Sequence, residues 1–442
     1  MTWRDVTTGF ATMAVLAAVS GSGRVFVGGL DAAPAPQRAD TIVKQAGRPV
    51  FAKGGTLVPD LSIGVVDGAQ EYMFGSVRDV LETRDGSILV VDGQAFAIRQ
   101  YDAKGAYVRT LGRKGQGPGE YTHPGLLAEL PDGRILLVDG GGVRINVYSR
   151  TGESIDTWSL ALAGSNVASS RIIVDTTGTV VIPLYAFGGG ILEGSRLLRF
   201  GPDGRMVDTI HAPVFAYTPP TATSRTARGN VVASIPFFPV TDWHWSPLGY
   251  MVTGVANRYA FELRLPRPGP TSSATIPAMR YRGPTTVWRP GDPVVSIRHN
   301  VPPVPINEEQ RSVERTGVER IIRQLDPTWR YAGPDIPRVK PPFKRLRVGE
   351  DGTLWVHLST PGERYMPDPP PSGSPTAAAG PLLPRWREPA VYDVFEPDGR
   401  YLGRVSMPRN VTIFRLSRDK VWGTAADDDD VAIVKRFRID WR

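Results

Sequence analysis

Cysteine is absent from this 442-residue sequence, and only five histidines are present. Without cysteine the chain has no disulfide, no thiolate metal ligand and no cysteine nucleophile. The histidines show no HExxH or related ligand spacing, so a zinc site would need side chains from distant parts of the chain. They are His123, His211, His244, His299 and His357.

Lysine is also scarce, with eight residues, so arginine supplies 44 of the 52 basic side chains. The arginines are dispersed, and no basic run alternates with aromatic residues as expected of a nucleic-acid site. The formal net charge of +8 is therefore spread along the chain, and dispersed charge produces only a weak field. We predict no nucleic-acid partner.

An apolar stretch of ten residues, Phe10–Val19, is too short to cross a bilayer as a helix. Arg4 precedes it and small residues follow it, which is the pattern of a secretory signal peptide over residues 1–20. A disordered N-terminal tail is the alternative, because Asp5 reduces the positive charge typical of a signal peptide's start. The signal interpretation predicts a periplasmic or extracellular chain without a transmembrane span, and it makes residues 21–56 a flexible linker.

Glycine and proline are abundant, at 48 and 41 residues, and they separate short apolar segments as tight turns separate strands. Two segments, Val80–Asp92 and Leu127–Asp139, share one pattern: a strand, an Asp-Gly turn and a second strand that ends in Val-Asp. Asp-Gly between apolar strands indicates a β-hairpin, because glycine adopts the positive φ that such turns require. In both copies a third strand, a second turn and a fourth strand follow, and 19 residues separate the two turn glycines.

The first turn recurs to give six copies, each expected to be a four-stranded antiparallel unit. The six positions are Asp85-Gly86, Asp132-Gly133, Thr177-Gly178, Leu248-Gly249, Asp351-Gly352 and Asp419-Lys420. Four strands repeated six times predict an all-β fold, a six-bladed β-propeller over residues 57–442. The last copy lacks a fourth strand, and we expect the N-terminal segment Leu61–Val66 to supply it and close the ring, because an open sheet edge would otherwise remain.

Three stretches interrupt the repeat and are predicted insertions: residues 213–239, 266–342 and 361–389. The second contains one helix from Asn307 to Leu325, which starts at a good N-cap residue and is followed by Pro327. We expect this helix to cap one mouth of the propeller or to dock on a partner. The third stretch is rich in proline and alanine, which favours a mobile loop.

The run Leu-Gly-Arg-Lys-Gly-Gln-Gly-Pro-Gly-Glu-Tyr at 111–121 precedes a strand pair that ends in Val-Asp, and Tyr392–Gly403 is a related unit near the C-terminus. Through these residues the chain resembles the bacterial six-bladed β-propeller family with NHL-like repeats, over roughly residues 57–442. The resemblance implies the fold but no activity, since propellers carry many functions. The glycine-rich run at 115–120 lacks the Gly-Lys-Ser/Thr end of a phosphate-binding loop, so we interpret it as a connection between blades.

Charged residues on the expected innermost strands are the candidate ligand-binding residues. Five of them are arginines, whose forked guanidinium groups suit carboxylate or phosphate. Asp242 and His244 face one side of a strand, because side chains alternate along it. The alternative is structural: the arginines pair with nearby acids such as Asp79 and Glu129, and His244 is a buried, satisfied residue. The candidates are Arg78, Arg171, Asp242, His244, Arg345, Arg347 and Arg415.

We predict a monomeric binding or scaffolding propeller without catalysis, with a protein, peptide or glycan partner. The arginines leave open whether this partner is anionic. The alternative is a metal-dependent propeller enzyme of the lactonase or peptidyl-lyase type, in which several blades contribute acidic, Asn or His ligands. The inner strands offer more arginines than metal ligands, which favours binding. Asp427–Asp430 is the candidate calcium site, but it lacks the spacing of a calcium loop and is more typical of a solvated turn. We therefore expect no cofactor.

The export hypothesis predicts a mature protein that begins shortly after Ser20 when the chain is expressed in its native host. Intact-mass spectrometry of the purified protein measures this directly. A processed form in the periplasm or medium would support the signal peptide. A cytosolic protein that still begins at Met1 would contradict it.

Overall fold

The computed structural model describes residues 41–139, 144–159, 171–184, 196–227, 229–268, 287–368, 382–426 and 432–442. Strands dominate these residues, and α1 (Glu308–Arg323) is the only α-helix among them. Within the same ranges no helix is long and apolar enough to cross a membrane. The predicted signal peptide, residues 1–20, lies outside the described residues.

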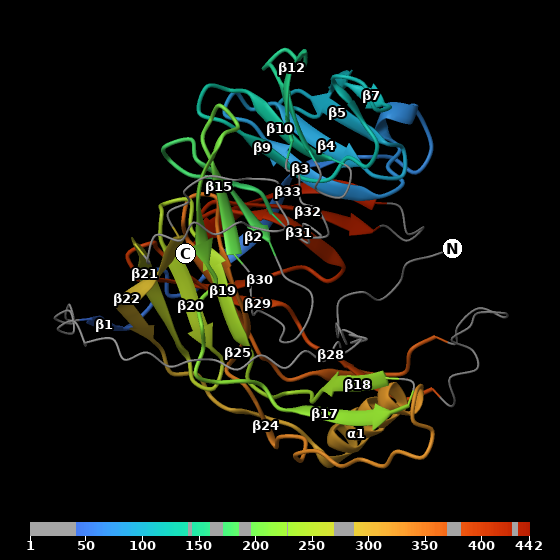
Figure 1. The fold of residues 1–442 in the computed structure, drawn as a ribbon, viewed down its shortest axis with the longest axis vertical. Coiled ribbons are helices and arrows are strands. Elements are labelled where there is room, and N and C mark those ends of the chain that lie inside the picture. The colour runs from blue at the N-terminus through green and yellow to red at the C-terminus, as the bar shows by residue number, and fades with distance from the viewer. Residues whose placement is uncertain are drawn as a thin grey trace, which may run out of the picture.

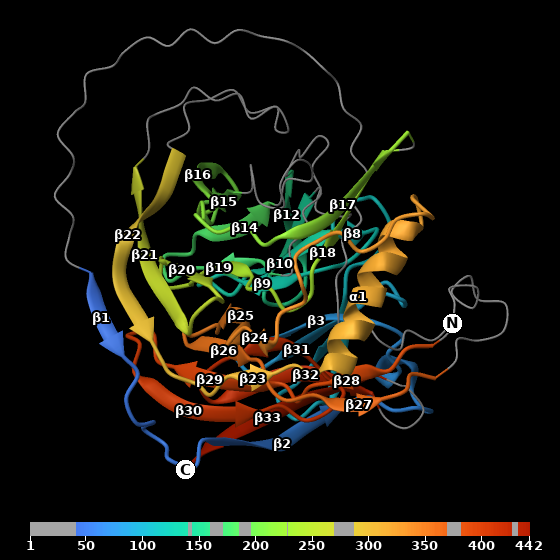
Figure 2. The same ribbon diagram turned by 90° about the horizontal axis from the view of Figure 1, so that it is seen from below.

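The strands form six antiparallel units of four, numbered here along the chain (Figures 1 and 2). Units 1 to 3 contain β3 (Val77–Glu82), β4 (Ile88–Asp92), β5 (Ala97–Tyr101) and β6 (Tyr107–Leu111); β9 (Leu127–Glu129), β10 (Ile135–Asp139), β11 (Arg144–Tyr148) and β12 (Ser154–Ser159); and β13 (Ile173–Val174), β14 (Val180–Leu184), β15 (Arg196–Phe200) and β16 (Met206–His211). Units 4 to 6 contain β19 (Thr241–Trp245), β20 (Met251–Val255), β21 (Ala260–Pro268) and β22 (Val287–Arg298); β25 (Phe343–Val348), β26 (Leu354–Leu358), β29 (Val391–Phe395) and β30 (Tyr401–Ser406); and β31 (Val411–Leu416), β32 (Lys420–Ala426), β33 (Ala432–Trp441) and β2 (Gly55–Ile63).

The first strand of each unit lies innermost, because first strands contact one another: β3 contacts both β9 and β31, and β19 contacts β25. Hydrophobic clusters fill the spaces between neighbouring units. Leu81 shares a buried cluster with Leu127 of unit 2, whereas Val80 shares one with Trp422 of unit 6. Adjacent residues of β3 thus pack against opposite neighbours, as the alternation of a strand requires. This is the blade arrangement of a β-propeller.

The first turns lie where the repeat predicts them. In units 1 to 5 the turn glycine has a φ between 84° and 87°, a left-handed conformation that residues with a Cβ rarely adopt. Unit 6 has Lys420 at this position and uses a shorter turn, in which the Ser417 N–H donates to the Lys420 carbonyl. The five glycines are Gly86, Gly133, Gly178, Gly249 and Gly352.

The repeated Val-Asp at the end of the second strand has a structural role. Asp92 of β4 is buried and accepts the backbone N–H of Gly75 at 3.1 Å. Asp139 of β10 is buried in the same way and accepts the N–H of His123 at 2.7 Å. Each carboxylate holds the segment that leads into the first strand of its own unit, because a buried charge must be matched by donors.

β2, near the N-terminus, pairs antiparallel with β33 and is the fourth strand of unit 6. The sequence predicted this strand at Leu61–Val66, but it runs from Gly55 to Ile63. It stops there because Gly64, with a φ of 133°, turns the backbone out of the ladder. Ile63 is buried in the cluster shared by units 6 and 1.

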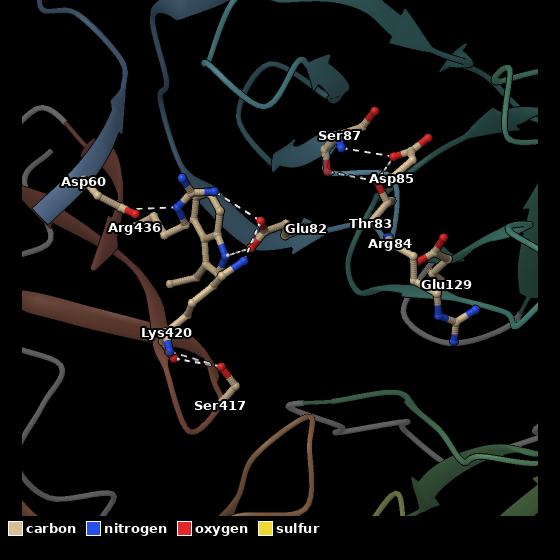
Figure 3. A network of polar contacts seen from close by, with 11 residues as sticks. Asp60, Glu82, Thr83, Arg84, Asp85, Ser87, Glu129, Ser417, Lys420 and Arg436 are labelled. Atoms are coloured by element: carbon tan, nitrogen blue, oxygen red, sulfur yellow. Dashed lines mark hydrogen bonds and ion pairs between the residues drawn. The ribbon is translucent and has the colours of Figure 1, made fainter. Parts of the chain in front are cut away.

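A polar network also joins unit 6 to unit 1 (Figure 3). Glu82 of β3 accepts hydrogen bonds from Lys420 Nζ at 2.9 Å, Trp422 Nε1 at 3.0 Å and Arg436 Nη1 at 3.1 Å. Arg436 Nε donates in turn to Asp60 of β2 at 3.0 Å. The Glu82 carboxylate of unit 1 is thereby bound by side chains from β32 and β33 of unit 6. Arg436 also connects Glu82 to Asp60 of β2.

An N-terminal belt, residues 41–54, runs along the outer strands of units 4 to 6. β1 (Ile42–Gln45) pairs in parallel with β22. Phe51 donates its N–H to a carbonyl of β30, and its ring stacks on Trp441 with centroids 5.3 Å apart. The prediction of a flexible linker over 21–56 is therefore wrong for the belt, since composition does not reveal backbone hydrogen bonds to strands far away in the sequence.

The insertions meet in an accessory body made of α1, β17 (Thr221–Thr226), β18 (Gly229–Ser234), β27 (Glu363–Tyr365) and β28 (Arg385–Arg387), all labelled in Figure 2. Val318 and Ile322 of α1 pack in one buried cluster with Ala222 and Val231 of the β17–β18 hairpin. All these segments leave the units after a fourth strand or between a second and a third strand. Such connections lie at the same end of antiparallel blades, so the insertions emerge together.

The prediction of an insertion over 266–342 is wrong for Val287–Arg298, because these residues form β22, the fourth strand of unit 4. The helix in this stretch matches its sequence signals, whereas the third insertion does not. The Asn307 side chain caps α1 by accepting the Gln310 N–H at 2.7 Å, and the helix ends at Arg323. Residues 361–389 were expected to be a mobile loop, but β27 pairs with β28 and Glu388 forms an ion pair with Lys340 at 2.8 Å. The loop prediction is wrong for these ends. The short remaining elements are a 3-10 helix (Gln70–Tyr72), β7 (Arg113–Lys114), β8 (Glu120–Tyr121), β23 (Val304–Pro305) and β24 (Val339–Lys340).

Removal of β2 is expected to unfold the protein. Burial of Ile63 contributes roughly 1.5–3 kcal/mol, and each of several lost backbone hydrogen bonds contributes about 1 kcal/mol. Together these approach the about 5–15 kcal/mol that stabilises a typical domain. A chain that begins at Tyr72 should therefore aggregate or melt early in calorimetry, whereas one that begins at Thr41 should melt as the mature protein does. Equal melting temperatures for the two chains would show that the β2–β33 pairing is dispensable.

Candidate functional site

Six of the seven candidate residues occupy two equivalent positions on the inner strands. The first turn begins at a residue whose backbone N–H and C=O groups both form hydrogen bonds across the turn. This residue is Thr83 in unit 1 and Gly349 in unit 5. Four residues before this opening, units 1 to 6 carry Asp79, Leu126, Arg171, Asp242, Arg345 and Ile413. Two residues before it, they carry Leu81, Ala128, Ile173, His244, Arg347 and Arg415. Arg78 stands outside both positions; its exposed side chain lies against Gly93.

The two aspartates at the first position join neighbouring units. Asp79 accepts the N–H of its own successor at 2.9 Å and the N–H of Leu127 in unit 2 at 2.8 Å. Asp242 repeats this geometry, with its successor at 3.0 Å and Leu346 of unit 5 at 2.6 Å. The Asp242 carboxylate is thus used structurally. Sequence reasoning did not give Asp79 this role, although its distance from the turn equals that of Asp242.

All three guanidinium nitrogens of Arg415 donate hydrogen bonds to protein groups. Its side chain is about as buried as that of Asp79, its ion-pair partner. Nε donates to the Val80 carbonyl at 2.9 Å, Nη2 donates to the Leu127 carbonyl at 2.8 Å, and Nη1 donates to Glu350 at 3.1 Å. Burial favours a lower pKa for Arg415, but the Asp79 and Glu350 carboxylates outweigh it and raise the pKa. Arg415 of unit 6 therefore links units 1, 2 and 5. This is the structural role that the sequence left open as the alternative to ligand binding.

Arg171 approaches the same place from unit 3. It donates to the Val348 carbonyl of unit 5. Burial lowers the pKa of Arg171 to about 10, Glu350 opposes this effect, and the charges of Arg415 and Arg347 add to it. Arg171 therefore lies within electrostatic range of two other predicted arginines, Arg347 and Arg415, and of the Glu350 carboxylate.

Arg345 and Arg347 differ from Arg415 because neither forms an ion pair within the described residues. Their positive field acts on His357, which faces Arg345 on the neighbouring strand. Burial lowers the pKa of His357 to about 3, with further lowering by Lys344, Arg347 and Arg345 against the opposing charge of Glu388. The imidazole is thus neutral at physiological pH, and the charges of Arg345 and Arg347 are not paired with a carboxylate among the described residues.

Asp242 and His244 lie together, as strand alternation predicts. His244 Nε2 is 3.2 Å from an Asp242 carboxylate oxygen, which is ion-pair distance if the imidazole is protonated. The angle does not suit a hydrogen bond, and this buried nitrogen has no other partner among the described residues. The pair therefore differs from a satisfied structural histidine.

Metal ligands are not gathered in the described chain, where no group of three or more His, Asp or Glu side chains has the geometry to hold an ion. The candidate calcium residues, Asp427–Asp430, lie outside the described residues. The glycine-rich run at 115–120 connects β6 to β9, as the sequence predicts. Glu120 accepts the Gly117 N–H at 2.9 Å, and Arg144 of unit 2 donates to the Glu120 carbonyl at 3.0 Å, so the run is tied to the blade it precedes.

Comparison with known proteins agrees with the fold. A family model described as a 6-bladed beta-propeller matches residues 69–171, which is less than half of the chain. No functionally curated protein matches the sequence. The six four-stranded units and the family model together identify a β-propeller.

Several solved structures are similar to this chain at low sequence identity. A candidate exported protein of Bacteroides fragilis is 11% identical, with 91% of this chain and 100% of that chain covered and a TM-score of 0.45. A member of a domain family from Bacteroides vulgatus is 10% identical, with 88% and 99% covered and a TM-score of 0.43. Virginiamycin B lyase of Staphylococcus aureus is 10% identical, with 87% and 94% covered and a TM-score of 0.36. Likenesses of this size carry no argument about a ligand or a reaction.

Arg415 and Arg345 should respond differently to the same substitution. Arg415→Gln leaves the buried Asp79 carboxylate without its cation, and loss of one partner of a buried pair costs about 3–5 kcal/mol. Arg345→Gln removes an exposed charge without an ion pair and should change the free energy of unfolding by less than about 0.5 kcal/mol. Urea denaturation measures both. Equal, small effects would show that the Arg415 contacts contribute little to stability.

Proposed function

We propose that this chain is an exported binding propeller that holds an anionic group of a protein, peptide or glycan partner on its inner strands. Arg345 and Arg347 of unit 5 are the principal contacts, and Arg171 adds its charge from unit 3. The guanidinium fork suits a carboxylate or phosphate group, which accepts two parallel hydrogen bonds from it. No catalytic step is part of the proposal.

One observation carries the proposal: Arg347 and Arg415 occupy equivalent inner positions, but of the two only Arg415 forms ion pairs within the described residues. Arg415 is buried and saturated by four partners. Arg347 stands at the same position in unit 5, yet within the described chain it has no ion pair, and the nearby Arg345 has none either. Charge that the fold leaves unbalanced is available to a ligand.

The accessory body supports a macromolecular partner. It emerges next to unit 5, where Lys340 and Lys344 share the Glu388 carboxylate at 2.8 Å and 2.7 Å. α1 is tied to the β27–β28 hairpin by the Arg364–Glu309 ion pair at 2.9 Å. A partner that reaches the inner strands at this end would meet the accessory body as well, and α1 would then act as the cap that the sequence suggested.

We infer a closed ring in which β2 joins the two ends of the chain, a repeat of the NHL type, and a monomer that works in the periplasm or outside the cell. Arg78 and His244 complete the candidate ligand set, and Asp242, whose carboxylate joins units 4 and 5, lies beside His244. The enzyme alternative requires a resident metal, so stoichiometric calcium or zinc in the purified mature protein would favour it over simple binding.

Anion binding is tested with inorganic phosphate and citrate as probes, because a ligand that binds only the folded state raises its melting temperature. The wild-type protein should be stabilised at constant ionic strength, and Arg345→Gln/Arg347→Gln should lose most of this gain. Arg205→Gln/Arg400→Gln is the matched control, since it removes the same charge from exposed turn residues. An unchanged response in the first variant would refute the inner-strand site.

A further inference from the structure

The N-terminal belt bridges the outer strands of units 4 and 5. Ala46 donates its N–H to a carbonyl of β22 at 2.7 Å, and Val50 donates to a carbonyl of β30 at 3.0 Å. Between these two anchors, the N–H groups of Gly47 and Arg48 have no acceptor within the described chain. The blue segment that leads from β1 toward β30 in Figure 2 is this bridge, and two of its backbone donors remain available.

A hollow of about 330 Å³ is lined by this bridge and by the turn that joins β29 to β30. Small-molecule sites in proteins commonly measure roughly 300–1,000 Å³, so the hollow has room for a small ligand. We call it the belt hollow. Its lining residues include Lys44, Gly47, Arg48, Gly399, Arg400 and Tyr401.

Three cationic side chains line the belt hollow, namely Lys44, Arg48 and Arg400, and none of its described lining residues is acidic. Lys44 and Arg48 form no ion pair among the described residues, and Lys44 Nζ instead donates to the backbone carbonyl of Asp398. Like charges around one hollow repel each other. A bound anion would therefore stabilise this arrangement, whereas water alone would leave the charge without a counter-ion.

Two acids of the adjacent turn are already engaged by the protein. The Asp398 carboxylate accepts the backbone N–H of Arg400 at 2.9 Å. The Glu396 carboxylate lies 3.4 Å from Arg400 Nη2, and it is shared with Arg418 at 3.2 Å. Arg400 is thus only partly neutralised, and the charges of Lys44 and Arg48 remain for a ligand.

We propose that the belt hollow binds a small molecule through a doubly charged oxyanion group, a phosphate monoester or a dicarboxylate. Lys44 and Arg48 supply two positive charges that match a dianion. The Arg48 guanidinium can donate two parallel hydrogen bonds, whereas the Lys44 ammonium acts as a point charge. The backbone N–H groups of Gly47 and Arg48 add donors of the kind that other anion sites use. The belt hollow shares no residue with the inner-strand site of the proposed function, so the two sites are tested separately.

Binding is measured by NMR on the full-length protein labelled with 15N-glycine, because Gly47 lines the belt hollow. Gly47→Ala identifies its signal and should preserve the fold, since an added Cβ would meet no atom within 4 Å. Inorganic phosphate and succinate are titrated separately at constant ionic strength, with acetate as a singly charged control. The Gly47 signal should shift saturably with a dianion, and acetate should bind at least tenfold more weakly. The stronger dianion titration identifies phosphate or dicarboxylate as the preferred group.

Arg48→Gln, at an exposed position, should lower the affinity for the dianion at least tenfold while the melting temperature stays unchanged. Arg205→Gln is the matched control, because it removes an exposed arginine that follows an Asp-Gly turn in unit 3 as Arg400 does in unit 5. Arg205→Gln and Arg345→Gln/Arg347→Gln should both keep the wild-type affinity at Gly47. The absence of a saturable shift with both dianions, equal affinity for acetate, or wild-type affinity in Arg48→Gln would overturn the proposal.

Discussion

Arg415 of unit 6 donates hydrogen bonds to groups on units 1, 2 and 5 from a side chain that is almost fully buried. A buried guanidinium is tolerated only where its donors are matched and its charge is balanced. Asp79 and Glu350 provide that balance, and Asp79 also accepts the Leu127 N–H of unit 2. The inner strands of four units therefore depend on one ion-pair network, and so does any ligand site built on them.

The first of the two equivalent inner positions has a different role in different units, depending on which residue occupies it. An aspartate there becomes a bridge to the next unit, as in units 1 and 4, because its two oxygens reach N–H groups of both strands. An arginine there can only donate, so it needs an acceptor from elsewhere. Arg171 finds a carbonyl of unit 5, whereas Arg345 remains exposed. The unbalanced charge of unit 5 follows from this difference.

The outer strands are protected unequally. The N-terminal belt and β2 cover the edges of units 4 to 6 with backbone hydrogen bonds. The outer strand of unit 3 is covered in part by β22, whereas β6 and β12 of units 1 and 2 pair only with the third strand of their own unit among the described residues. In every unit the third and fourth strands pair with a register shift. Such irregularities, with exposed charged side chains, discourage edge-to-edge association.

The sequence by itself determined the features that depend on neighbouring residues: the Asp-Gly turns, the four-strand repeat, the Asn307 cap and the inward-facing positions. It also indicated the N-terminal strand of unit 6, although three residues too late at its end. Only the tertiary structure decided which arginine is neutralised and which segments form the belt and the accessory body. Arg415 meets Asp79 across 336 residues, and Arg345 meets no acid in the described chain. Such pairings arise when blades pack around a common centre, and no local pattern specifies which distant side chain will be opposite.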